Sequence, residues 1–171
     1  MKNLYRLFLP FLTLLLFLGW MLNCTGFDSN NIQQQVTPIN IKDIQYSAWI
    51  NAENWVTTNV FGLPARSHEI QTNQLNNSVL EKHQLYVYVK INDEIHPLPY
   101  TQTTETGELR YDYTVLPNSK LKLVLINLKG AQKPVEEQQY RYLLIPNSLA
   151  HKLTVDMNDY DNVSTSFNLA E

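Results

Sequence analysis

Cysteine and glycine are both scarce in this chain of 171 residues. Cys24 is the single cysteine, so the sequence can form neither an intrachain disulfide nor a cysteine metal site. The chain has 5 glycines and contains no Gly-x-Ser-x-Gly elbow, phosphate-binding loop or dinucleotide-binding loop. The usual sequence signatures of hydrolases and nucleotide-binding enzymes are therefore missing.

Charge is also low. The formal net charge is -3, and without Lys2 and Arg6 the chain has 11 basic against 16 acidic residues, or -5. No basic stripe is present, which argues against a nucleic-acid partner. With 44% hydrophobic and 17% charged residues, the chain can build the core of one domain.

The histidines form no metal-binding motif. They are dispersed along the chain, as His68, His83, His96 and His151. Residues 156–161 are faintly similar to a calcium loop, but they lack the glycine at the sixth position and the glutamate at the twelfth. We therefore expect no catalytic residue, no metal and no cofactor, and we do not expect an enzyme.

A long hydrophobic run occurs near the amino terminus. Residues 7–22 are almost wholly apolar and follow Lys2 and Arg6, which is the layout of a secretory signal. We expect a signal peptide over residues 1–23. An uncleaved membrane anchor is an alternative, because the run is near the lower limit of roughly 17 residues for spanning a bilayer.

Cys24 follows this run directly, where bacterial lipoproteins carry the cysteine that is lipidated. Residues 21–24, Met-Leu-Asn-Cys, are loosely similar to a lipobox, which usually has small residues before the cysteine. The alternative is ordinary cleavage after Gly26 and secretion. Residues 24–43 are rich in Asn, Gln, Ser and Thr, and we expect them to form a flexible tether that begins at the lipidated cysteine.

The clearest structural signal is a period of two in residues 85–91. Its members alternate between one face, Leu85, Val87, Val89 and Ile91, and the other, Tyr86, Tyr88 and Lys90. This alternation predicts a half-buried strand, and residues 92–94 with 95–98 predict a turn and a second arm. We expect the first face to be buried together with Leu121, Leu123 and Leu125, which show the same pattern.

Other segments with strand character are separated by turn signals: residues 44–50, 55–60, 66–71, 109–115, 120–128 and 140–145. Arg141 lies in the last of these, and we expect it to snorkel or to pair with a carboxylate. These short strands predict an all-β fold, an antiparallel β-sandwich of Ig-like or Greek-key type over residues 44–155. A barrel is the alternative.

Few segments show helical or irregular character. We expect at most one short helix, within residues 72–82 and capped by Thr72 or Asn73. Residues 101–107 are expected to form a polar loop. Residues 156–171 are expected to form a polar, frayed carboxy-terminal tail, after an optional strand at 153–157.

Three stretches together, residues 85–90, 95–100 and 140–146, carry a resemblance. In their order, Leu-Tyr-Val-Tyr-Val-Lys, Ile-His-Pro-Leu-Pro-Tyr and Tyr-Arg-Tyr-Leu-Leu-Ile-Pro, the chain resembles a family of small exported bacterial lipoproteins with a single β-sandwich domain and no assigned activity. The resemblance covers roughly residues 46–151. It implies the fold and an extracytoplasmic location, and it supplies no catalytic residue.

These observations favour a non-catalytic structural or interaction module of the cell envelope, attached to the membrane through Cys24 and contacting an envelope protein or a glycan. Secretion or a signal anchor would change the location only. The alternative function is a carbohydrate- or peptide-binding module that uses exposed aromatic rings of Trp55, Tyr86 and Tyr88. Whether those rings lie exposed in one row or are buried discriminates between the two functions.

Overall fold

The computed structural model describes residues 43–105, 107–129 and 137–170. The chain divides into two units, residues 1–39 and 40–171, and all the described residues belong to the second. The predicted signal peptide, Cys24 and the predicted tether up to residue 42 lie outside the described residues. None of the described helices is long and apolar enough to cross a membrane.

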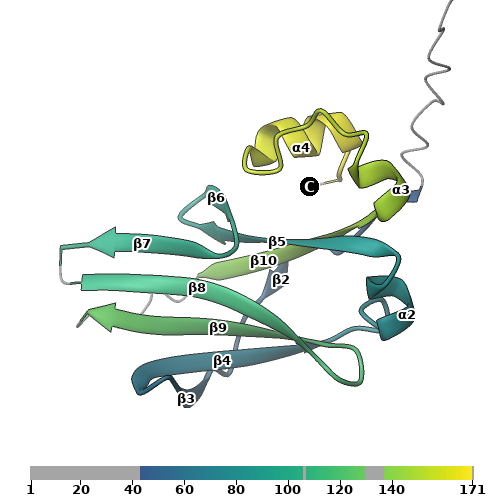
Figure 1. The fold of residues 1–171 in the computed structure, drawn as a ribbon. Coiled ribbons are helices and arrows are strands. Elements are labelled where there is room, and N and C mark those ends of the chain that lie inside the picture. Colours follow the sequence, from purple (N-terminus) through teal and green to yellow (C-terminus); the bar gives the residue numbers. More distant parts are fainter. Residues whose placement is uncertain (1–42, 106, 130–136, 171) are drawn as a thin grey trace, which may run out of the picture. The chain divides into compact units, whose positions relative to one another are not determined.

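Two antiparallel five-stranded sheets form the fold (Figure 1), so the predicted β-sandwich is confirmed. The first sheet has the order β1-β10-β5-β6, with β2 also paired to β10, and the second has the order β3-β4-β9-β8-β7. The strands are β1 Gln45–Tyr46, β2 Ile50–Asn51, β3 Val56–Val60, β4 Leu63–Gln71, β5 His83–Ile91, β6 Glu94–Pro97, β7 Tyr100–Thr104, β8 Gly107–Leu116, β9 Lys120–Lys129 and β10 Gln138–Pro146.

The core between the sheets has the composition that the period-two pattern predicts. Val87, Val89 and Ile91 of β5 are buried in one cluster with three leucines of β9, and Leu85 packs against that cluster. The leucines are Leu121, Leu123 and Leu125. The predicted hairpin is also confirmed, because β5 pairs with β6 across a turn at Asn92 and Asp93.

The outer face of the first sheet is covered as well, which the sequence reading missed. Helix α4, Tyr160–Phe167, lies over this sheet (Figure 1), and its side chains join a second buried cluster. Asp159 begins the helix, since its side chain accepts a hydrogen bond from the backbone N–H of Asn162 at 3.1 Å. The expected frayed tail is therefore wrong: Tyr160, Val163 and Phe167 are spaced for one helical face and are buried.

Arg141 of β10 is buried beneath α4. One guanidinium nitrogen donates to the Tyr160 hydroxyl at 2.6 Å, and another donates to the Ala170 carbonyl at 2.7 Å. The guanidinium carbon lies 4.8 Å from the centre of the Trp49 ring, within cation–π range. Arg141 is 2% exposed, so the expectation that it snorkels is wrong, and both oxygens that accept these hydrogen bonds are uncharged. It ties the strand, the helix and the carboxy-terminal residues together.

Three helices are present in the described ranges, two more than expected: α2 Asn77–Leu80, α3 Asn147–Ala150 and α4. The expected helix is α2, and it has a single turn. Its cap is Asn76, which accepts from the Val79 N–H at 3.1 Å, where Thr72 or Asn73 was predicted. Asn and Asp favour caps over helix interiors, which explains why α2 begins late.

Two other predicted segments differ from the structure. Residues 101–107 contain most of strand β7, which pairs with β8, so the polar-loop prediction is wrong. Residues 101–104 of this edge strand are all polar, Thr-Gln-Thr-Thr, and Thr101 and Thr103 are exposed, so the usual apolar signal is missing. Residues 44–50, predicted as one strand, form only the short β1 and the start of β2.

Candidate interaction surface

The three aromatic residues predicted to bind a ligand do not form one surface. Trp55 packs into the cluster between the sheets, and its indole N–H donates to the Ala52 carbonyl at 3.1 Å. Tyr86 and Tyr88 lie on the opposite side of the first sheet, in the cluster beneath α4. Tyr88 has no exposed surface, and its hydroxyl donates to the Met157 carbonyl at 2.9 Å. The sheet thus separates Trp55 from the two tyrosines.

The phenol groups of the cores are held neutral. Burial is the main cause that raises the pKa of Tyr111 to about 12, with a smaller effect of the neighbouring Tyr100. Burial likewise raises the pKa of Tyr88 and of Tyr140 above the ordinary value. A raised phenol pKa disfavours the tyrosinate form, so these groups act as neutral hydrogen-bond donors in packing.

A polar cleft of about 450 Å³ lies beside the β5–β6 turn. Its walls come from residues 51–53, from the turn itself, and from residues 137–139 at the start of β10. Lys90 makes an ion pair of 3.2 Å with Asp93, so the cation of this cleft already has a partner. Amide and carboxylate groups dominate the rest of the lining.

A second cleft, of about 540 Å³, lies on the other side of the same turn and is acidic. Its side chains are engaged locally: the Glu94 carboxylate lies 3.5 Å from His96, and Asp159 caps α4. No group of three or more metal-ligating side chains within the described residues is placed to hold an ion.

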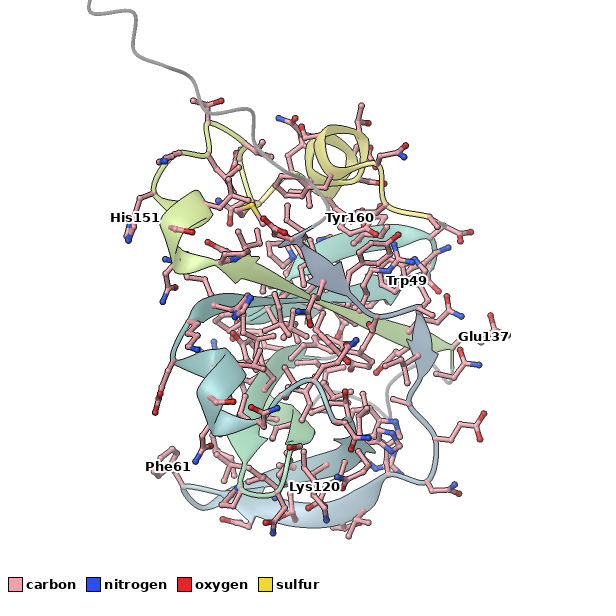
Figure 2. All side chains as sticks on the ribbon, turned by 90° about the vertical axis from the view of Figure 1, so that its right-hand side faces the viewer. Trp49, Phe61, Lys120, Glu137, His151 and Tyr160 are labelled. Atoms are coloured by element: carbon pink, nitrogen blue, oxygen red, sulfur yellow. The ribbon has the colours of Figure 1, made fainter. Side chains whose placement is uncertain are left out.

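Exposed apolar side chains gather on the β3–β4 hairpin. Within the described residues, three large hydrophobic side chains are exposed, and all three belong to this hairpin: Val56 at 65%, Phe61 at 101% and Leu63 at 37%. Figure 2 shows Phe61 pointing away from the ribbon. Exposed apolar groups that gather in one place mark contact sites more often than scattered ones do. We call β3 together with Phe61 and Leu63 the β3 edge.

The local sequence explains this hairpin. Val60 pairs with Leu63, so the turn consists of Phe61 and Gly62 alone. Both have positive φ, +50° and +84°, which is the conformation of two-residue hairpin turns that match the strand twist. The Asn59 side chain accepts from the Gly62 N–H at 2.7 Å and supports the turn.

The sequence contained a signal for this surface. Glycine between two strand-like runs is a turn signal, and Gly62 lies between two such runs. The predicted strands end at residue 60 and begin again at residue 66, whereas β4 begins at Leu63. The misplaced turn hid the fact that Phe61 occupies its tip.

The β3 strand also leaves backbone groups available. It is the outer strand of its sheet in the described part of the chain, with β4 on its inner side. Hydrogen-bonded and non-hydrogen-bonded pairs alternate in antiparallel sheets, and Val60 and Leu63 beside the tight turn are a bonded pair. The N–H and C=O groups of Thr57 and Asn59 therefore point away from β4, and the residue opposite Asn59 is Pro64, which has no N–H.

No family model matches the chain, and no curated protein or solved structure matches it either.

Proposed function

We propose that this chain is a lipoprotein of the bacterial envelope whose sandwich domain is a non-catalytic interaction module, with the β3 edge as its contact surface. The observation that carries the module proposal is the gathering of exposed apolar side chains on one hairpin. The anchor part rests on the sequence around Cys24 and on the family resemblance. The burial of Tyr88 speaks against the alternative, a row of exposed rings for a sugar or peptide.

The proposed anchor would hold the domain at a membrane surface. Two or more acyl chains on Cys24 give stable attachment, where a single chain is marginal. A random-coil tether of about 20 residues would allow a reach of roughly 25 Å, from about 5–6 Å times the square root of the residue number. The β3 edge could then meet a partner held in the same membrane.

The anchor is tested by labelling. In a bacterial host grown with labelled palmitate, the full chain should take up label and Cys24→Ser should not, while the melting curve stays the same. A mature chain that begins at Phe27 would mean secretion instead, and membrane retention with an intact Met1 would mean an uncleaved anchor. Either result would overturn the lipoprotein proposal.

The contact surface is tested separately in intact cells. A photo-crosslinking amino acid at position 61 should give a protein adduct of defined mass. The same amino acid at Thr103, an exposed residue of the edge strand β7, is the matched control. Adducts at both positions, or at neither, would show that the β3 edge is not a specific contact surface.

A further inference from the structure

We propose that the partner of the β3 edge is a second copy of this chain, with the two β3 strands paired antiparallel about a two-fold axis at Thr58. This inference deepens the proposed function and relies on its membrane anchor only for the strength of pairing. The two sheets that contain β3 would join into one continuous sheet. Antiparallel addition at a free edge is a general mode of strand recognition, with backbone hydrogen bonds that supply affinity.

The β3 sequence is close to symmetric. It reads Val-Thr-Thr-Asn-Val, so a two-fold axis at Thr58 places Val56 opposite Val60 of the partner subunit and Thr57 opposite Asn59 of the partner subunit. Thr57 and Asn59 are the residues whose N–H and C=O groups point outward. In this register Thr57 of each copy forms a hydrogen-bonded pair with Asn59 of the other copy. The pair at Thr58 between them is then a non-hydrogen-bonded pair, as the alternation in antiparallel sheets requires.

The same register covers exposed apolar surface. Val56, Thr58 and Val60 share one face of β3, because side chains alternate along a strand. On that face of the joined sheet, Val56 lies beside Val60 of the partner subunit. Leu63 of the partner subunit follows on the next strand, because Val60 and Leu63 are paired within each copy. Val56, exposed at 65%, would be covered by Val60 of the partner subunit, its direct neighbour on this face.

Charge does not oppose the pairing. The strand has no ionisable side chain. The nearest cation on the neighbouring strand is Arg66, which is paired with Thr57. In the pair, Arg66 of one copy lies three strand spacings, about 14 Å or more, from the same arginine of the other copy. This separation exceeds the Debye length of about 8 Å at physiological ionic strength, so the repulsion between the two cations is screened. A neutral and nearly symmetric edge suits an identical neutral edge better than it suits a charged partner.

The other long edge strands are less suited to this role. β6 contains Glu94 and ends at Pro97, and charge and proline are the usual protection of a sheet edge. β7 is uncharged, but its exposed side chains are Thr101 and Thr103, so it offers no large apolar group to cover. This contrast between two neutral edges makes β7 the natural control.

The size of the contact determines where the dimer would form. Five residues span about 17 Å, so the pairing buries less than the roughly 1,200–2,000 Å² of a stable interface. In dilute solution the dimer should therefore be weak. Two copies anchored to one membrane are confined to a thin layer at its surface, and this confinement favours weak pairing without new contacts.

The test is a symmetric disulfide in the full chain. Opposite residues of a non-hydrogen-bonded pair have Cα atoms about 4.5 Å apart, within the range that a disulfide spans. After oxidation of isolated membranes with copper phenanthroline, Thr58→Cys should give more covalent dimer than the wild-type chain. The wild-type chain serves as the baseline because any dimer linked through Cys24 forms in it as well. Thr103→Cys should stay at that level. Equal dimer from both variants, or none from Thr58→Cys, would overturn the proposal.

A charge substitution provides the second measurement. Thr58→Lys places two like charges directly opposite each other across the axis and should weaken self-association at least about ten-fold in sedimentation equilibrium. Thr103→Lys, the same change on β7, should leave it unaltered. Unchanged association of the Thr58→Lys chain, with a melting curve that shows it is folded, would contradict the pairing.

Failure of the anchor and failure of the pairing give different results. If Cys24 is not lipidated but the pairing is right, the purified full chain with both Cys24→Ser and Thr58→Cys still cross-links at high concentration. If the anchor is right but the pairing is wrong, the chain takes up palmitate and Thr58→Cys gives no dimer above background.

Discussion

Replacement of Val87 by aspartate is the sharpest test of the core register. Val87 is 1% exposed, in the middle of β5, and packs in the cluster that contains the β9 leucines. The change removes about 1.5–3 kcal/mol of apolar burial. It also places a carboxylate between two sheets, where the desolvation penalty is several kcal/mol per ion. The sum, at least about 5 kcal/mol, is comparable with the total stability of a domain, about 5–15 kcal/mol.

Urea unfolding followed by circular dichroism measures this effect, and two variants separate its parts. Val87→Ala removes volume without charge and should destabilise by about 2 kcal/mol. Val56→Asp is the same substitution at a position that is 65% exposed, and it should change the free energy of unfolding by less than about 0.5 kcal/mol. If Val87→Asp behaves like Val56→Asp, the assignment of β5 faces is refuted.

Three further predictions concern the helix and the buried phenols. Tyr88→Phe leaves the Met157 carbonyl without its donor and should lower the free energy of unfolding by about 1–3 kcal/mol in urea; no change would show that the hydroxyl does not hold the segment before α4. Asp159→Ala removes the cap of α4 and should cost about 1 kcal/mol, with Asp159→Asn as the nearly neutral control. Because the folded pKa of Tyr111 is raised from 10 to about 12, its contribution to stability is complete below pH 10 and is lost as the pH rises to about 12. Stability measured from pH 9 to 12 should fall less steeply in Tyr111→Phe, and equal slopes would contradict the pKa.

Strands with strong alternation were predictable, and edge strands were not. The inner face of β5 and the leucines of β9 were assigned correctly, because burial on one side requires apolar residues at every second position. β7 was taken for a loop, since an edge strand keeps few apolar positions. The candidate surface was missed for a related reason: Phe61 reads as a core residue until its place at the hairpin tip is known.

What the sequence determined by itself is local: the period of β5, the hairpin after it, the scarcity of cysteine and the hydrophobic run before Cys24. What only the tertiary structure decided is which surfaces are covered. Tyr88, on the polar-looking face of β5, is buried because Met157, 69 residues further along the chain, and the helix α4 that follows it return to cover it. β3 remains an edge because β4 pairs with it on one side only among the described strands. Burial and exposure depend on contacts between distant segments, and no local pattern records those contacts.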